Sequence, residues 1–287
     1  MSFNSVESLL DASRDLPLWR AVLEHDCQEE GIPPEQSLSR MDALWQAMKS
    51  AVADYDPARH SASGLVGGAA ARVESSPHPI VGGFVTQVIA AAMKTGECNA
   101  CMRRIVAAPT AGASGVLPGV LLPYQSQYHT SDQEMVHALY AAAGFGQVIA
   151  ARASISGAEG GCQAEVGSAS GMAAAALVSL HGGTPEQMAH ACAMALSNTL
   201  GLVCDPVAGL VEVPCVKRNV AGAMNALACA EMALAVVESA IPCDEVIDAM
   251  RSVGALLPDS LRETGRGGLA ATPTALRAAQ RLRGGAL

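Results

Sequence analysis

Three cysteines lie in stretches rich in glycine or proline, with the sequences EGGCQAE around Cys162, LVCDPVAG around Cys204 and VPCVKRN around Cys215. We expect all three in loops, where irregular backbone can turn three thiolates toward one point and unpaired N–H groups can donate to sulfur. Lys217 and Arg218 follow Cys215 closely, and their charges favour the thiolate form that binds metal. The pattern predicts a metal site with three cysteine ligands.

Three soft ligands without a pair of CxxC motifs favour an iron–sulfur cluster with one open iron over structural zinc, which usually has four protein ligands. The spacing by itself leaves a structural zinc domain and a non-catalytic iron–sulfur sensor open. The other cysteines are interpreted as packing residues, because buried free cysteine most often only packs. They are Cys27, the CxxC pair Cys98 and Cys101, Cys192, Cys229 and Cys243.

The stretches between these candidates predict helices. From residue 107 onward, glycine-rich loops alternate with alanine-rich stretches that carry almost no charge, such as SGMAAAALVSLHGG. Helices that are apolar on most faces are interior helices, and small alanine faces allow close packing. Alternating strand patterns are nearly absent. We therefore predict an all-α fold, a compact bundle of alanine-rich helices whose glycine-rich loops converge on an iron–sulfur cluster.

Several helix boundaries can be placed from local signals. Thr184, followed by Pro185 and by Gln187 three residues after the cap, predicts the start of a helix. Residues 219–240 predict one long helix, and residues 243–258 predict another that ends before its proline.

The chain is expected to form a single domain over residues 1–287. Residues 1–60 carry apolar residues at helical spacing and predict a lead-in of amphipathic helices. Residues 60–83 are rich in glycine and serine and predict a flexible segment, either a linker or a mobile loop that approaches a site. Residues 84–287 form the predicted core that binds the cluster and the substrate.

Composition excludes several classes of protein. The net charge of −9 argues against a nucleic-acid or anionic-membrane partner. Uncharged stretches are interrupted by proline and glycine, so none supplies the ~20 mostly apolar residues that a membrane-spanning helix needs. The first residues, MSFNSVESLLDASRD, are polar and acidic rather than a basic start before an apolar run. We therefore expect a cytoplasmic protein.

Four long blocks of the sequence resemble the iron–sulfur L-serine dehydratases, in particular the α chain of the two-chain type. The blocks are APTAGASGVLPG, ASISGAEGGCQAEVGSASGMAAAA, LGLVCDPVAGLVEVPCVKRN and RETGRGGLAATP. The resemblance implies an all-helical catalytic domain that converts L-serine to pyruvate and ammonia without pyridoxal phosphate. It also implies a [4Fe-4S] cluster held by Cys162, Cys204 and Cys215, with one iron lacking a protein ligand.

The same resemblance implies a partner. Single-chain members of the family add a regulatory domain and can end in a tail whose cysteine reaches the open iron. This chain ends RLRGGAL, without such a cysteine. We therefore expect a separate regulatory β chain, and we expect the enzyme to form a higher oligomer.

Elimination of hydroxide from serine needs a Lewis acid on the hydroxyl, which an iron with an open position supplies, and a base for the α-proton. Fixed donors must also hold the substrate carboxylate and amino group, and the glycine-rich blocks APTAGASG and ASISG offer them. The residues expected to bind the substrate are Thr110, Ser114, Gly115, Ser154 and Ser156.

Polar and charged residues also lie near the cysteines in the sequence. Lys217, Arg218 and Asn219 either bind the substrate carboxylate or offset the charge of the cluster. Glu159 and Glu165 flank the first cysteine ligand and are interpreted as helix-end charges, and the general base stays unassigned.

Related chemistry remains open at this stage. A cysteine desulfidase or a threonine dehydratase would use the same Lewis acid, because loss of hydrosulfide or of a hydroxyl on a methyl-bearing carbon makes the same demand. A pyridoxal phosphate enzyme is less favoured. Its three candidate lysines, Lys49, Lys94 and Lys217, do not lie in a Schiff-base loop beside a phosphate-cradling strand.

Overall fold

The computed structural model describes residues 3–284, which form the all-α fold predicted from the sequence. Within these residues the β-structure is a single bridge between Cys204 and Arg262. No helix in this part of the chain has both the length and the apolar character needed to span a bilayer. The α-helices of residues 3–284 are α1 (Val6–Ala12), α2 (Leu18–Glu30), α3 (Pro34–Ala53), α4 (Ala69–Glu74), α5 (Gly83–Ala100), α6 (Val116–Tyr128), α7 (Asp132–Arg152), α8 (Gly157–Gly160), α9 (Ser168–Leu180), α10 (Pro185–Ser197), α11 (Cys215–Leu234), α12 (Cys243–Leu256) and α13 (Pro273–Gly284).

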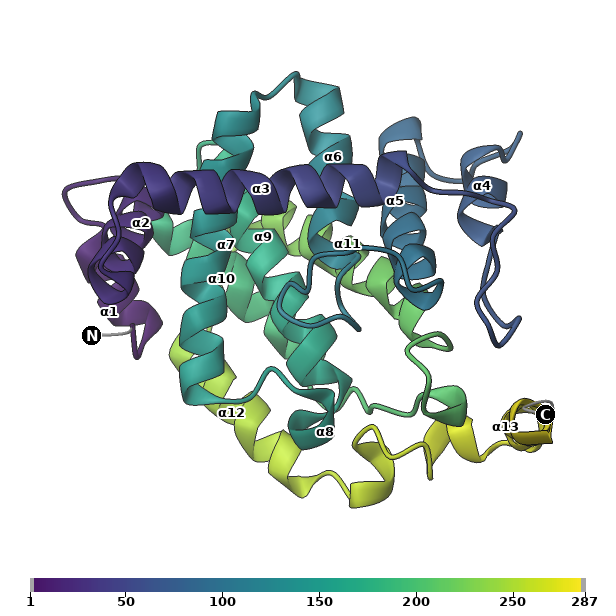
Figure 1. Cartoon of the computed structure of the whole chain (residues 1–287). Coiled ribbons are helices and arrows are strands. Elements are labelled where there is room, and N and C mark those ends of the chain that lie inside the picture. The colour runs from purple at the N-terminus through teal and green to yellow at the C-terminus, as the bar shows by residue number, and fades with distance from the viewer. Residues whose placement is uncertain (1–2, 285–287) are drawn as a thin grey trace.

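The first helices lie on the outside of the bundle, and the C-terminal segment runs along its lower edge in Figure 1, from α12 to α13. Pro17 separates α1 from α2, because proline disfavours helical backbone at the residue before it. Helices α2 and α3 both contact α7. Trp45 of α3 is fully buried in this contact region, so the apolar face of the lead-in is part of the core.

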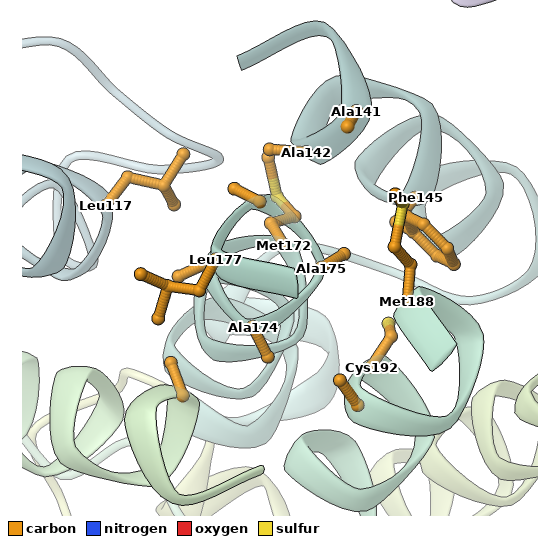
Figure 2. Packing of buried hydrophobic residues seen from close by; sticks show 14 of the residues in the cluster. Leu117, Ala141, Ala142, Phe145, Met172, Ala174, Ala175, Leu177, Met188 and Cys192 are labelled. Atoms are coloured by element: carbon orange, nitrogen blue, oxygen red, sulfur yellow. The ribbon is translucent and has the colours of Figure 1, made fainter. Parts of the chain in front are cut away.

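Helix α9 is the central helix of the bundle and is buried along nearly its whole length. Figure 2 shows Ala174 and Ala175 of α9 surrounded by Phe145 of α7, Cys192 of α10 and Leu117 of α6. A helix without a polar face is stable only when other helices enclose it. The alanine-rich stretch that predicted an interior helix therefore forms the centre of the fold.

Small residues bring neighbouring helices into close contact. A Cβ atom at Gly119 of α6 would lie 2.8 Å from the Cβ atom of Ala92 in α5. A Cβ atom at Gly171 of α9 would lie 2.9 Å from the sulfur of Cys192 in α10. Non-bonded carbon atoms prefer about 3.5–4.0 Å, so any larger residue at these glycines would push the helices apart.

The predicted boundaries of α10 and α12 are confirmed. The hydroxyl of Thr184 accepts a hydrogen bond from the N–H of Gln187, and the Gln187 side chain accepts one from the N–H of Thr184. This reciprocal capping box is the one expected from the sequence. Helix α12 begins at Cys243 and ends at Leu256, before the proline that was expected to stop it.

The predicted helix over residues 219–240 was wrong at both ends. Helix α11 begins at Cys215, directly after Pro214, because the N–H that proline lacks is one that a helix start leaves unpaired in any case. The helix ends early because the backbone reverses after Leu234, where the N–H of Val237 donates back to the carbonyl oxygen of Met232.

Residues 60–83 contain α4, and buried carboxylates attach this segment to the core. The hydroxyl of Ser61 donates to Glu212 at 2.9 Å, and the backbone N–H of Ala69 donates to Glu97 at 2.9 Å. Both carboxylates are 7% exposed or less. The glycine- and serine-rich segment therefore lies against the loop that precedes α11.

The carboxylate of Asp132, at the start of α7, connects three helices. It accepts hydrogen bonds from Gln125 of α6 at 2.7 Å and from Trp45 and Lys49 of α3, each at 2.9 Å. The hydrogen bonds from Gln125 and Trp45 are the main reason that the pKa of Asp132 lies far below its usual range. A lowered pKa in the folded state means that this carboxylate stabilises the fold above its ordinary pKa of about 4.

Replacing Asp132 by alanine should lower the free energy of unfolding at pH 7 by about 1–2 kcal/mol, which allows for solvent screening of a partly exposed carboxylate. The difference from the wild type should shrink as the pH falls below about 4, because the carboxylate becomes protonated. Urea unfolding followed by circular dichroism at pH 7 and pH 3 measures both effects. Asp42→Ala removes an exposed carboxylate of α3 and should cost less than about 0.5 kcal/mol. An equal loss of unfolding free energy in the two variants would show that Asp132 does not stabilise the contact between its three helices.

Candidate metal and substrate site

Cys162 opens a helical segment. A π-helical turn, η1 (Gln163–Gly167), follows it directly and continues into α9. Gly161 has a φ of 75°, the left-handed backbone that lets the chain turn sharply into this helix. Turns of π-helix are rare and occur frequently at functional sites.

The prediction that all three cysteines lie in loops was wrong for Cys162 and Cys215, because the glycine or proline before each one starts a helix. Cys215 is the first residue of α11. Of the three, Cys204 alone has extended backbone, with its N–H donating to Leu261 at 2.9 Å and its carbonyl accepting from Glu263 at 2.8 Å. Helix N-termini carry unpaired N–H groups and a partial positive charge, which favour thiolates.

The sulfur atoms of Cys162 and Cys204 and a carboxylate oxygen of Glu165 lie within 4.8 Å of one another. Cys215 lies outside this close group but is near enough for the charges of Cys162 and Glu165 to act on its thiol. All four residues are 9% exposed or less. The structure therefore gathers the three predicted cysteines in one buried region and adds a carboxylate to them.

Arg218 brings a positive charge into this region. Its Nη1 donates to the sulfur of Cys162 at 3.3 Å and to the carbonyl oxygen of Val203 at 2.8 Å. Its Nη2 lies 2.8 Å from Oδ1 of Asp205, which is 3% exposed, and Oδ2 of Asp205 accepts from the N–H of Leu269 at 2.7 Å. Arg218 therefore contacts the sulfur of Cys162, although Cys215 is its neighbour in sequence.

The thiols differ in how their surroundings shift their pKa values. A hydrogen bond from Cys204 lowers the pKa of Cys162, assisted by the charge of Arg218 and opposed by burial. Hydrogen bonding to Cys162, together with burial, raises the pKa of Cys204. Burial raises the pKa of Cys215 to about 12. A cation at this point would be needed to hold all three as thiolates.

Two glycines enclose the carboxylate of Glu165. A Cβ atom at Gly157 would lie 2.7 Å from its Oε2 and 3.1 Å from the sulfur of Cys204, and a Cβ atom at Gly112 would lie 3.2 Å from both carboxylate oxygens. Burial raises the pKa of Glu165. The hydroxyl of Thr110 lies beside the carboxylate and lowers this pKa, although the two groups do not have regular hydrogen-bonding geometry. The carboxylate is therefore fixed in place next to the thiols.

Asn219 holds the loop that precedes α6. Its Oδ1 accepts from the N–H of Gly115 at 2.7 Å, and its Nδ2 donates to the carbonyl oxygens of Gly112 at 2.8 Å and Cys215 at 2.9 Å. The side chain is almost completely buried. Because the N–H of Gly115 is used by Asn219, Gly115 supports the loop and is not free to donate to a ligand.

The predicted substrate hydroxyls fall into two groups. The hydroxyls of Thr110 and Ser114 are buried and have no hydrogen-bond partner among the described residues. Buried hydroxyls are normally paired, so these two mark a place for a ligand or water. Ser154 instead donates to Glu159 at 2.6 Å and accepts from the N–H of Ser156 at 3.0 Å, just before α8.

Lys217 is exposed, unlike its neighbours in sequence. It lines a separate cavity of about 140 Å³ together with Glu97 and Glu212. Of the three consecutive residues singled out from the sequence, Arg218 contacts Cys162, and Asn219 contacts Cys215 and the hydroxyl-bearing loop.

The sequence of the chain is similar to a known protein family. The family model described as Serine dehydratase alpha chain matches residues 13–270. This chain belongs to that family. The resemblance inferred from the four sequence blocks is thereby confirmed.

The similarity to individual family members extends over almost the whole chain. The chain is 47% identical over 290 residues to the probable L-serine dehydratase, alpha chain, of Bacillus subtilis (strain 168), covering 99% of this chain and 97% of that protein. It is 42% identical over 277 residues to the L-serine dehydratase, alpha chain, of Peptoniphilus asaccharolyticus, covering 94% and 95%. L-serine dehydratase 1 of Escherichia coli (strain K12) is 44% identical over 181 residues, which are 62% of this chain and 40% of that protein.

The donor set of this family member fits a metal–sulfur centre. Soft thiolate ligands select iron–sulfur clusters, zinc or copper(I), and the close group of Cys162, Glu165 and Cys204 is compatible with metal binding. The absence of a side chain at Gly157 leaves a cradle between Glu165 and Cys204 that a single Cβ atom would fill. The guanidinium of Arg218 adds a hydrogen bond to sulfur, as partners of metal ligands commonly do.

Two residues of the site were not assigned to it from the sequence. Glu165 does lie at a helix end, in the first turn of η1, but its carboxylate faces the thiols. Its spacing from Cys162 was a usable signal, because residues three apart share one face of a helix. Asp205 follows Cys204 directly, yet only the folded chain shows that it pairs with Arg218.

Asn219→Ala should lower the free energy of unfolding by about 2–3 kcal/mol, because it leaves buried backbone groups of Gly112 and Gly115 without partners. Asn99→Ala is a matched control that removes one hydrogen bond, 3.0 Å long, to Ala111 of the same loop from a less buried position. It should cost less than about 1 kcal/mol. Urea unfolding of both variants tests the difference, and similar losses would show that Asn219 does not hold the loop.

Proposed function

We propose that this chain is the catalytic α chain of an iron–sulfur L-serine dehydratase, a lyase that converts L-serine to pyruvate and ammonia. The observation that carries the proposal is the close group of Cys162, Cys204 and Glu165, with Cys215 buried near it, beside a loop with two unpaired, buried hydroxyls. Relatives that match nearly the whole chain bear the name L-serine dehydratase, alpha chain. The reaction removes water from L-serine, and a water molecule then releases ammonia from the resulting imine.

Cys162, Cys204 and Cys215 would hold a [4Fe-4S] cluster with one iron that has no cysteine ligand. When bound, such a cluster supplies a Lewis acid that polarises the substrate hydroxyl and stabilises its departure. Two of the cysteines stand at helix N-termini, where the helix dipole favours a negatively charged sulfur cluster. Arg218 offsets part of that charge from its position beside Cys162.

The substrate would be held by the chain itself. The unpaired hydroxyls of Thr110 and Ser114 are placed to bind the serine carboxylate, and the positive end of the dipole of α6 lies directly after them. Ser154 and Ser156, on the segment before α8, are proposed to bind the amino group. Asn219 positions the first of these segments through its three hydrogen bonds, and the buried setting keeps bulk water away from the reacting group.

A separate regulatory β chain would complete the enzyme. The chain covers 97% and 95% of two relatives named alpha chain but 40% of the longer Escherichia coli relative. This difference in length supports a division of the enzyme into two chains. We also propose that residues 1–287 act as one catalytic domain in the cytoplasm, within a higher oligomer. The net charge of −9 suits neither a nucleic-acid nor an anionic-membrane partner.

Replacing Cys162, Cys204 or Cys215 by serine should remove most of the iron from anaerobically purified protein. Pyruvate formation from L-serine with the β chain should fall by more than about 100-fold, because each thiolate is one of three cluster ligands. Cys27→Ser, on α2, is the control and should keep both iron and activity. Wild-type protein with about four irons per chain but no lyase activity would favour an iron–sulfur sensor instead.

Thr110→Ala and Ser114→Ala should each lower kcat/KM for L-serine by about 10–100-fold with unchanged iron content, the effect of one lost hydrogen bond to a charged group. The corresponding alanine variants of Ser154 and Ser156 should raise KM. Ser252→Ala, an exposed hydroxyl on α12, is the control. Steady-state pyruvate assays measure these effects, and unchanged turnover in all four site variants would overturn the substrate assignment.

A further inference from the structure

Glu165 is a buried carboxylate without a role in the reaction proposed above. Its side chain has no ion-pair partner within residues 3–284, and the groups beside its carboxylate are the sulfur of Cys204, at 4.0 Å, and the hydroxyl of Thr110. The guanidinium of Arg218 is committed to Cys162, Val203 and Asp205. A buried carboxyl group without a cation either stays protonated or pairs with a positive charge, and a metal centre beside Cys162 and Cys204 would supply that charge.

The geometry indicates where that charge belongs. The carboxylate oxygen of Glu165 and the sulfurs of Cys162 and Cys204 all lie within the same 4.8 Å of one another. The oxygen is therefore close enough to both sulfurs for all three atoms to face one metal centre. Gly157 and Gly112 have no side chains, so they leave room for the carboxylate in this position.

We propose that Glu165 is the resting-state ligand of the iron that the three cysteines leave open, and that L-serine displaces it on binding. The inference rests on the proposed function and replaces the expectation that this iron has no protein ligand. The exchange breaks one bond from a carboxylate oxygen to iron and forms one from the substrate hydroxyl oxygen to iron, without a change in oxidation state. A carboxylate is a hard ligand and holds such an iron less firmly than a thiolate does, which suits a ligand that must leave.

The neighbouring loop places the substrate at the same point. Gly112, which packs against the carboxylate oxygens, lies between the unpaired hydroxyls of Thr110 and Ser114. A serine molecule held by those hydroxyls would therefore lie beside Glu165. The displaced carboxylate would remain in contact with the pocket, so it can return when the product leaves.

The test compares Glu165→Gln with Glu263→Gln in the holoenzyme, reconstituted anaerobically with its β chain. Glu263 is the matched control, because it is exposed, is not in the close ligand group, and yet its charge acts on both Glu165 and Cys204. Electron paramagnetic resonance follows the conversion of the four-iron cluster to a three-iron cluster during mild oxidation. Glu165→Gln should lose the fourth iron about tenfold faster than the wild type, and Glu263→Gln should keep the wild-type rate.

With saturating L-serine, Glu165→Gln and the wild type should lose the fourth iron at the same rate, because the substrate then supplies the same ligand in both proteins. Equal rates without serine, or a difference that serine does not change, would overturn the inference while leaving the proposed function intact. Wild-type holoenzyme without a four-iron cluster would instead overturn the proposed function.

A measurement on the wild type covers the case in which Glu165→Gln fails to fold. Protein labelled with carbon-13 at its glutamate carboxyl groups should show a carbon-13 coupling to the reduced cluster by electron–nuclear double resonance. The coupling should disappear when L-serine is added. A cluster without that coupling in the absence of serine would show that Glu165 is not its ligand.

Discussion

The arrangement around the cysteines depends on the contacts of the Arg218 guanidinium. It carries a positive charge into a buried region that otherwise holds thiols and carboxylates, and it bonds to Cys162, Val203 and Asp205. Asp205 in turn accepts a hydrogen bond from Leu269, so one cation links the start of η1, the Cys204 segment, α11 and the C-terminal segment. Loss of one partner of a buried ion pair costs about 3–5 kcal/mol, which explains why so many contacts surround this group.

The helical scaffold explains why these groups can be buried together. Helix α9 has no polar face and must lie at the centre of the bundle, so the turn that leads into it, with Cys162 and Glu165, is also central. Alanine and glycine let α5, α6, α10 and α11 approach closely enough for their ends to meet there. Asn219 then joins α11 to the loop before α6. Cys162 and Cys215 therefore lie where helices begin, and the dipoles of those helices favour negative charge at this place.

Much of the fold was predictable from the sequence, because its signals are local. The alanine-rich stretch of α9 predicted an interior helix, and Thr184 with Gln187 predicted the start of α10. The three cysteines were singled out from their glycine- and proline-rich surroundings, and their role as cluster ligands stays a prediction. The predicted loop was wrong for Cys162 and Cys215, because glycine and proline occur both in loops and at the starts of helices. The pairing of Asp205 with Arg218, and the position of Glu165 among the thiols, depend on contacts between segments that only the folded chain brings together.

The isolated bridge at Cys204 bears on how the protein is made. The backbone of Cys204 forms its hydrogen bonds with Leu261 and Glu263, and its neighbour Asp205 bonds to Leu269. Synthesis runs from the N-terminus, so the ribosome has produced every cysteine of the site well before these partners emerge. The backbone around Cys204 therefore reaches its final conformation only after residues 261–269 have been made. These residues complete the surroundings of Cys204 once the other cysteines of the buried region are already present.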